Sequence, residues 1–265
     1  MVDVHEVLAD LDAESASVDA MVADLPEPEW AKPTPAAGWT ISTQIAHLAW
    51  TDSITLLAAT DPDTFYAKLS EAAENLDGYV DRGAAEFMAP PAELLARWRD
   101  GRAELIAALA AVPAGERLPW FGVRMTAPSM ATARIMETWA HGLDVAEALG
   151  IERAPTNRIR HVVHLGVRTM GHGFMMHGKP APEVPVRVEL TAPDGTLWTY
   201  GPEDAGNRVT GSAVDFCHLV TQRGHRDDLD LVATGPVADE WLDVAQAFAG
   251  PPGSKRDPKA ADENR

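Results

Sequence analysis

The sequence is poor in cysteine: Cys217 is its one thiol, so no disulfide bond can form within the chain. Such usage is typical of a reducing compartment, and any metal site has to be built from histidines and carboxylates. Uninterrupted apolar runs of about 18 residues, the length that a membrane-spanning helix requires, are also missing. Residues 1–12 are acidic and helically patterned, unlike a signal peptide. We therefore expect a cytoplasmic protein with no membrane partner.

Basic residues are scarce relative to acidic ones. Lys and Arg number 22, Asp and Glu number 40, and the formal net charge at pH 7 is −18. Such a chain should repel phosphate backbones and anionic lipid surfaces, which argues against a nucleic-acid partner. Hydrophobic residues nevertheless make up 46% of the sequence and charged residues 23%, as in ordinary globular proteins. The chain is therefore expected to fold around a hydrophobic core.

Amphipathic helices dominate the first half of the chain. Apolar residues recur there at steps of three and four, the spacing that places them on one face of a helix. Residues 26–38 are rich in proline and are predicted to be an extended connection. A further helix, with a turn near Asp77 and Gly78, is expected within residues 61–88. The long helices are predicted at residues 4–25, 41–59, 91–112 and 129–149, and they form a four-helix bundle.

The pattern changes after Ala154. Residues 184–190 alternate between apolar and polar side chains, as a half-buried strand does, and Asp194-Gly195 is a strong signal for a hairpin turn. Further strands are predicted at 197–200 and 229–233, and helices at 156–170, 212–223 and 237–248. The predicted fold class is therefore α+β. The predicted domains are a metal-binding helical bundle in residues 1–154, a small α/β domain in 155–249 and a disordered tail in 250–265.

One helix of the bundle carries a stripe of polar side chains. The stripe consists of Arg134, Glu137, His141 and Asp144, whose steps of three and four place them on one face. A solvated face with an ion pair between Arg134 and Glu137 is one interpretation. The other is that Glu137 and His141 bind a metal ion together with a histidine of a facing helix, for which His47 is the natural candidate. Two histidines and one carboxylate leave a fourth position open, as in catalytic zinc sites.

Two motifs resemble a known family. Residues 38–40 (GWT) are followed by residues 45–50 (IAHLAW), and residues 137–144 read ETWAHGLD. These segments are similar to the signature of DinB-like four-helix metalloproteins, in particular of the mycothiol-dependent maleylpyruvate isomerase branch. In that branch the bundle is followed by a small α/β domain similar to sterol-carrier-type folds. The resemblance spans nearly the whole chain, because this sequence shows the same succession.

The resemblance also implies the site residues. The metal triad of that family maps onto His47, Glu137 and His141 of this sequence. A further similarity covers residues 219–223, where an arginine at the end of a helix faces the site in relatives. The resemblance therefore implies that Arg223 binds a carboxylate of the substrate, since a guanidinium can hold both of its oxygens.

The implied activity is that of a zinc-dependent isomerase or S-transferase. Its cosubstrate would be mycothiol or a similar low-molecular-weight thiol, which zinc deprotonates so that the thiolate attacks a small electrophilic substrate. One alternative is a metal-dependent hydrolase of the same fold, with Asp144 or Asp52 as the base. Another is a non-enzymatic protein whose α/β half binds a hydrophobic small molecule. The sequence leaves the electrophile, the metal, the thiol and the oligomeric state open.

Other reactive side chains have ordinary explanations. His161 pairs with His164 at helical spacing, and His172 lies near His177. A second metal site there is the alternative to surface or core positions, which we favour. Cys217 has no obvious activating base nearby, so it is expected to be a small buried side chain rather than a nucleophile.

Overall fold

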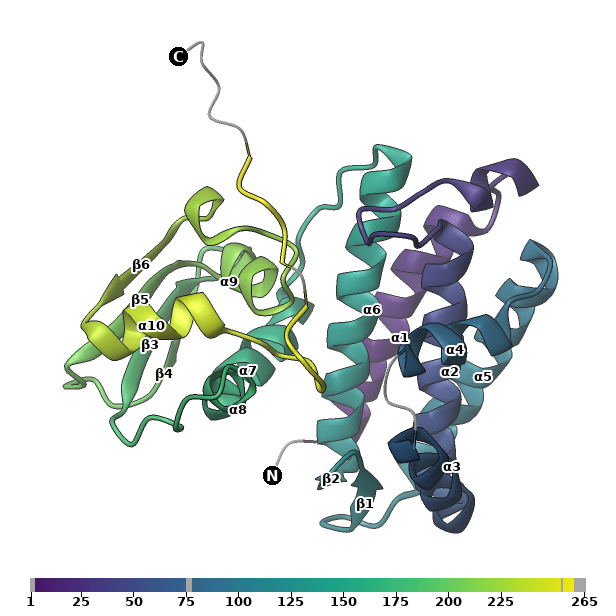
Figure 1. Cartoon of the computed structure of the whole chain (residues 1–265), viewed down its shortest axis with the longest axis horizontal. Coiled ribbons are helices and arrows are strands. Elements are labelled where there is room, and N and C mark those ends of the chain that lie inside the picture. Colours follow the sequence, from purple (N-terminus) through teal and green to yellow (C-terminus); the bar gives the residue numbers. More distant parts are fainter. Residues whose placement is uncertain (1–2, 75–77, 254, 260–265) are drawn as a thin grey trace. The chain divides into compact units, whose positions relative to one another are not determined.

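Figure 1 shows the computed structural model of the chain, which describes residues 3–74, 78–253 and 255–259. The chain divides into two compact units, Met1–Arg153 and Ala154–Arg265. The first unit is helical apart from one short hairpin, and the second is built on a small sheet. The fold class is therefore α+β, as predicted. Among the described helices, none is both long enough and apolar enough to cross a membrane.

Four long helices make up the frame of the first unit. They are α1 (Val4–Val22), α2 (Ile41–Thr60), α5 (Pro91–Ala111) and α6 (Ala127–Leu149). In Figure 1 they run side by side; α2 packs against α5 and α6, and α1 packs against α6. The shorter elements are η1 (Glu27–Ala31), α3 (Pro62–Glu74), α4 (Tyr79–Phe87), β1 (Arg117–Trp120) and β2 (Val123–Thr126). The predicted four-helix bundle is therefore present, with its helices close to their predicted bounds.

The start of α2 is fixed by a capping box. The hydroxyl oxygen of Thr40 accepts a hydrogen bond from the backbone N–H of Thr43 at 3.3 Å. The hydroxyl oxygen of Thr43 in turn accepts one from the backbone N–H of Thr40, also at 3.3 Å. These bonds satisfy two N–H groups that a helix start leaves without partners. Because the helix begins at Ile41, the polar residues Gln44 and His47 follow within two turns and lie in its buried face.

Two hydrophobic clusters hold the helices of the first unit together. The larger members of one are Trp50, Phe65, Leu105 and Met130, and those of the other are Trp30, Ile45, Leu94 and Trp98. Each such side chain contributes about 1.5–3 kcal/mol when it is fully buried. Apolar packing therefore fixes the positions of α2 and α6, which carry the polar residues considered below.

The second unit contains a four-stranded sheet of order β4–β3–β5–β6. The strands are β3 (Val186–Thr191), β4 (Leu197–Tyr200), β5 (Asn207–Ser212) and β6 (Leu231–Thr234). β3 and β5 are parallel, whereas the other two pairs are antiparallel. The helical elements are η2 (Asn157–Ile159), α7 (Arg160–Arg168), α8 (Met170–Met176), α9 (Ala213–Val220), η3 (Arg226–Asp228) and α10 (Pro236–Val244). Of these, α9 and α10 pack on the strands.

Two predicted segments differ from the structure in the type of helix or its continuity. The connection over residues 26–38 contains the 3₁₀ helix η1, with Pro28 in its first turn, where a missing N–H costs nothing. The helix predicted at 156–170 is interrupted at Thr169, which separates α7 from α8. The hydroxyl of Thr169 lies 2.7 Å from the carbonyl oxygen of Gln246, which ties this break to the end of the unit.

The sequence analysis also did not predict β1, β2 and β5. β1 and β2 have four residues each, too few for a periodic pattern to appear. In β5, Gly211 has a φ of +143°, and a Cβ there would lie 2.1 Å from the carbonyl oxygen of Asp230. Position 211 therefore requires a glycine. Because glycine has no side chain to contribute to an alternating pattern, the sequence signal for this strand is weak. The helix predicted at 237–248 ends at Val244, after which the backbone N–H of Ala247 donates to the carbonyl of Val220 at 2.8 Å.

Two predictions fall partly outside the described residues. Asp77, of the turn predicted between α3 and α4, lies outside them, whereas Gly78 is described and has a left-handed φ of +67°. In the tail, residues 254 and 260–265 lie outside. The described residues of the tail form no helix or strand, and the backbone N–H of Lys259 donates to a carboxylate oxygen of Asp228 at 2.9 Å.

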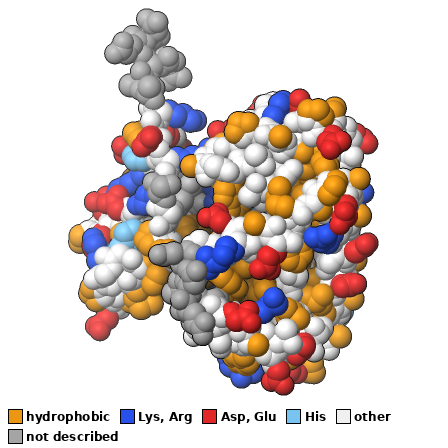
Figure 2. Space-filling view, turned by 45° about the vertical axis from the view of Figure 1, so that its right-hand side comes forward, with side chains coloured by type: hydrophobic (Ala, Val, Ile, Leu, Met, Phe, Trp, Pro, Cys, Tyr) orange, Lys and Arg blue, Asp and Glu red, His pale blue; other side chains and the backbone are white. Residues whose placement is uncertain are grey.

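The surface carries charges of both signs. On the face shown in Figure 2, acidic side chains are spread among basic and apolar ones. Some of them are paired, as Asp19 is with Arg99 at 2.6 Å and Glu93 with Arg97 at 2.8 Å. Exposed pairs of this kind contribute about 0–1 kcal/mol each, so they add little to the stability of the fold.

Candidate metal centre

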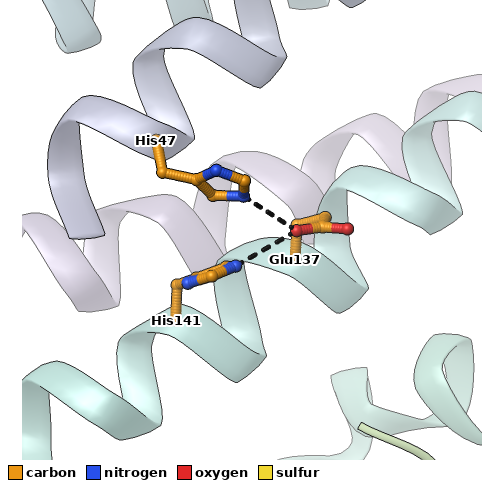
Figure 3. A group of neighbouring side chains, drawn as sticks. All are labelled: His47, Glu137 and His141. Atoms are coloured by element: carbon orange, nitrogen blue, oxygen red, sulfur yellow. Dashed lines mark hydrogen bonds and ion pairs between the residues drawn. The ribbon is translucent and has the colours of Figure 1, made fainter. Parts of the chain in front are cut away.

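Three polar side chains from two helices converge inside the helical unit. His47 lies on α2, and Glu137 and His141 lie one turn apart on α6. Because α2 packs against α6, His47 faces the other two residues across the contact between the helices, as Figure 3 shows. One possible ligand atom from each residue lies within 4.8 Å of the other two. The structure thus brings together the three residues that were predicted to be metal ligands.

Glu137 occupies the centre of this ligand cluster. Its Oε2 atom lies 3.3 Å from Nε2 of His47 and 3.2 Å from Nε2 of His141. The two imidazole rings are close, with centroids 4.3 Å apart. Both ring nitrogens are directed at the same carboxylate oxygen in Figure 3. Three ligand atoms therefore meet in one small region, which is the arrangement that a metal ion requires.

The ionisation states of the cluster suit a cation. Burial, together with the charge of His141, lowers the pKa of His47 to about 4, so its imidazole is neutral at pH 7. Burial opposes the ionisation of Glu137, but its close contacts with the two histidines and the charge of Arg134 outweigh burial and hold its pKa well below the usual value. A neutral imidazole and an ionised carboxylate are the forms that bind metals.

The polar stripe of α6 is buried. Arg134 is 3% exposed and Asp144 is 2% exposed, so the interpretation of the stripe as a solvated face is wrong. The expected contact between Arg134 and Glu137 is present, with Nη2 of the arginine 3.8 Å from Oε1 of the carboxylate. The guanidinium also lies over the ring of Trp120, 5.7 Å from its centroid. Because Arg134 approaches Oε1, Oε2 is left to face the two histidines.

Aromatic rings surround the two histidines. The ring of Trp39 lies 5.2 Å from that of His47 and is stacked on His141 at 5.8 Å. Trp50 approaches His47 at 5.8 Å. The indole N–H of Trp39 donates to Asp81 at 2.9 Å, which holds this ring in place from α4. Apolar rings around a ligand cluster limit access by water and strengthen its electrostatic interactions.

The donor set fits a divalent metal ion. Zinc accepts two imidazole nitrogens and one carboxylate oxygen, and three protein ligands leave a fourth position for a water molecule or a substrate. The same donors also serve iron(II) in non-haem enzymes. The chemistry of the cluster therefore supports a divalent metal and does not by itself select zinc.

The other predicted residues lie outside the ligand cluster. Asp52 is buried on α2 and accepts a hydrogen bond from the indole of Trp98, and Asp144 is buried on α6. Neither carboxylate belongs to the group that could hold the metal. Arg223 follows α9 in the second unit, and its Nη1 donates to the carbonyl of Thr221 at 2.8 Å. The role of Arg223 toward a substrate stays a prediction.

Among the described residues, the remaining histidines and the cysteine form no second metal site. In the part of the chain that the structure describes, the cluster on α2 and α6 is the one group of three or more residues that could hold a metal. His177 instead caps its own helix, since its Nδ1 lies 2.9 Å from the carbonyl of Gly173. Cys217 is fully buried, and burial raises the pKa of its thiol well above the usual value. This agrees with the expectation that Cys217 is not a nucleophile.

Gln44 is a residue of the site that the sequence analysis did not select. Its side chain is fully buried, and its Oε1 lies 2.6 Å from Nδ1 of His141. Gln44 precedes His47 by three residues on α2, and this spacing places both on one face of the helix. A polar side chain one turn before a candidate ligand on the same helix is the signal in the sequence that could have identified it.

Comparison with known proteins assigns the helical unit to a family. The model described as mycothiol maleylpyruvate isomerase N-terminal domain matches residues 11–146, which include the whole ligand cluster. The chain belongs to this family. Its membership confirms the resemblance found in the sequence and supports an enzymatic role. A second model, described as wyosine base formation, matches residues 182–234 in the second unit, away from the cluster residues in the sequence.

Relatives of the whole chain are also known. Two proteins of Mycobacterium tuberculosis, from strains CDC 1551 / Oshkosh and ATCC 25618 / H37Rv, are each 54% identical over 257 residues, which is 97% of this chain and 100% of the relative. Both are named only as uncharacterized proteins. Two crystal structures of the mycothiol-dependent maleylpyruvate isomerase, one of a mutant, have TM-scores of 0.57 and 0.61 at 16% identity, over 88% of this chain and 93% of theirs. At that identity they show a shared fold.

Proposed function

We propose that this protein is a zinc-dependent enzyme that uses mycothiol or a similar low-molecular-weight thiol. Its reaction would be the isomerisation of a small electrophilic substrate or S-transfer to it. The convergence of His47, Glu137 and His141 carries this proposal, in a family named for a mycothiol-dependent isomerase. Zinc held there would supply a position at which a thiol loses its proton. A free small thiol also requires a reducing compartment, which supports a cytoplasmic location.

The ligand residues determine the charge of the loaded site. His47 and His141 contribute neutral nitrogens, and Glu137 contributes one negative charge, so a site holding a divalent ion keeps a net charge of about +1. That charge favours an anionic fourth ligand over a neutral one. Because hydroxide would satisfy this preference as well as a thiolate, the choice of a thiol is supported by the family rather than by electrostatics.

For Arg223 we propose the binding of a substrate carboxylate. A guanidinium forms two parallel hydrogen bonds with a carboxylate, which fixes the orientation of the substrate as well as its affinity. The preceding residue, Gln222, has a left-handed φ of +57°, which is uncommon for a residue other than glycine. This backbone conformation sets the direction in which the chain leaves α9 and thus the position of Arg223.

Metal analysis tests the ligand cluster. The purified wild-type protein should contain about one zinc ion per chain, because the described part of the chain holds one set of ligands. His141→Ala should lose the metal, whereas His5→Ala, which changes an exposed histidine on α1, should retain it. Full metal content in His141→Ala would show that the metal binds elsewhere.

Cobalt substitution tests the thiol. Titration of the cobalt-loaded protein with mycothiol should produce a near-ultraviolet charge-transfer band from sulfur to cobalt, which hydroxide does not give. An unchanged spectrum, together with a reaction that runs at full rate without thiol, would reject the thiol and favour the metal-dependent hydrolase. A metal ion saturated by four protein ligands would instead favour the non-enzymatic alternative.

A further inference from the structure

Gln44 lies behind His141 in the interior of the helical unit. The Oε1 atom of Gln44 is 2.6 Å from Nδ1 of the imidazole. The opposite ring nitrogen, Nε2, is the atom that faces Glu137 at 3.2 Å. Because a neutral imidazole carries one proton on one of its two nitrogens, the partner of Nδ1 determines whether Nε2 is free to bind a metal.

The hydrogen bonds around Gln44 form a consistent chain of donors and acceptors in this structure. The carbonyl oxygen of Trp39 can only accept, and the hydroxyl of Thr34 donates to it at 3.0 Å. Since the hydroxyl of Thr34 has one proton, its oxygen can then only accept, and it lies 2.8 Å from Nε2 of Gln44. The amide nitrogen of Gln44 is therefore directed at Thr34, and its oxygen is directed at His141.

This relay of hydrogen bonds determines where His141 carries its proton. An amide oxygen cannot donate, so Nδ1 of His141 has to be the donor of the short bond. The lone pair of a neutral His141 is then on Nε2, which faces Glu137. If the amide were reversed, Gln44 would donate to Nδ1 and the proton would lie on Nε2, where a metal ion would have to displace it.

The relay of hydrogen bonds is held by the backbone at Thr34, and it reaches only one of the two histidines. The backbone N–H of Thr34 also donates to the carbonyl of Trp39, at 2.8 Å, so two hydrogen bonds join these two residues. The ring of Trp39 stacks on His141. Nδ1 of His47, by contrast, is buried and has no hydrogen-bond partner among the described residues. The orientation of His141 is therefore prepared by the fold, and that of His47 is not prepared in this way.

We infer that Gln44 is a positioning residue that keeps the proton on Nδ1 of His141 and so presents Nε2 to the metal ion. This inference rests on the proposed metal site, but the position of the proton can be measured without the metal. Partners of this kind typically change metal affinity by about 10- to 100-fold when they are removed.

Nitrogen-15 NMR of the histidine rings in the full-length chain tests the position of the proton. In the metal-free wild type, Nδ1 of His141 should give the signal of a protonated nitrogen, and zinc should leave it protonated. In Gln44→Leu the proton should distribute between both ring nitrogens. An unprotonated Nδ1 in the metal-free wild type would overturn the inference. If the wild type binds no zinc, the proposed function fails, while this spectrum still decides the role of Gln44.

Zinc affinity, measured by competition with a chelator, is the second readout. Gln44→Leu should bind zinc about 10- to 100-fold more weakly. Gln44→Glu keeps an acceptor toward Nδ1 and should stay within a few-fold of the wild type. Thr34→Val is a milder change at a half-buried position. It should give an intermediate loss of zinc affinity, because the side-chain amide of Gln44 would lose its partner and could rotate.

A matched control separates positioning from a general loss of stability. Thr43→Val makes the same substitution in the capping box of α2, and it should lower the melting temperature without changing zinc affinity. Equal losses of affinity in Gln44→Leu and Gln44→Glu, or no loss in either, would show that the hydrogen bond to Nδ1 does not position His141.

Discussion

The indole nitrogen of Trp98 donates a hydrogen bond to Oδ2 of Asp52 at 3.2 Å in the interior of the helical unit. Trp98 is completely buried, and Asp52 is only 5% exposed. Burial raises the pKa of Asp52 from 3.8 to about 6, although the charge of Arg134 and the bond from Trp98 favour the ionised form. In the folded protein this carboxyl group is therefore protonated at pH values where the unfolded chain has already released the proton.

The free energy of unfolding should consequently fall as the pH rises from about 4 to about 6, because the unfolded state ionises first. The difference between the two pKa values of Asp52 corresponds to about 3 kcal/mol, and above pH 6 this loss stays constant. Asp52→Asn should remove this part of the pH dependence, whereas Asp63→Asn, on the exposed start of α3, should retain it. Urea unfolding at several pH values provides the comparison. Parallel curves for wild type and Asp52→Asn would contradict the raised pKa.

The contact between Gly83 and Trp50 should tolerate no side chain. A Cβ at Gly83 would lie 2.2 Å from Cε2 of the indole, and that indole packs beside His47. Gly83→Ala should therefore lower the free energy of unfolding by about 1–3 kcal/mol. Gly101→Ala is the matched control on α5: its Cβ would meet nothing within 4 Å, and it should stabilise the helix by about 0.5–1 kcal/mol. Equal effects in denaturant unfolding would argue against the close approach at Gly83.

Zinc should raise the thermal stability of the wild type but not that of Glu137→Gln. A ligand that binds only the folded state adds about 4 kcal/mol at a thousandfold excess over its dissociation constant. Removal of zinc with a chelator should lower the melting temperature without unfolding the bundle, because the two hydrophobic clusters contain no metal ligand. Thermal scans with and without zinc measure this difference. An equal shift in Glu137→Gln would place the stabilising metal at another site.

Arg223→Lys should impair substrate binding while leaving zinc content unchanged. Lysine keeps the positive charge but cannot form the two parallel hydrogen bonds of a guanidinium. We expect kcat/KM for a substrate that bears a carboxylate to fall about 10- to 150-fold, mainly through KM, since a hydrogen bond to a charged group contributes about 1.5–3 kcal/mol. Steady-state kinetics on zinc-loaded protein measure the effect, and an unchanged kcat/KM would remove Arg223 from the substrate site.

The long helices could be predicted from the sequence because each carries an apolar face over several turns. The elements that were missed lack such a pattern. Gly211 occupies a position in β5 that the approach of the Asp230 carbonyl imposes, and no local rule predicts that approach. The break at Thr169 depends on Gln246, which lies 77 residues away in the chain. Contacts between distant segments thus decide where these short elements begin and end.

The same distinction applies to the candidate site. Glu137 and His141 are one turn apart, so their common face follows from helical spacing. His47 lies 90 residues before Glu137, and only its place in a facing helix made it a candidate. Gln44 contacts His141 across 97 residues, and its fully buried position on α2 becomes visible only in the folded structure. Local periodicity therefore identifies ligands on one helix more readily than the groups that orient them from another.

The burial of Cys217 has a consequence for the proposed reaction with an electrophilic substrate. Such a substrate alkylates accessible thiolates, which are the reactive form of cysteine. The single thiol of this chain is fully buried, and its raised pKa keeps it protonated and unreactive. In the proposed reaction the attacking sulfur therefore has to come from a diffusible thiol, which an isomerisation would release unchanged and an S-transfer would consume.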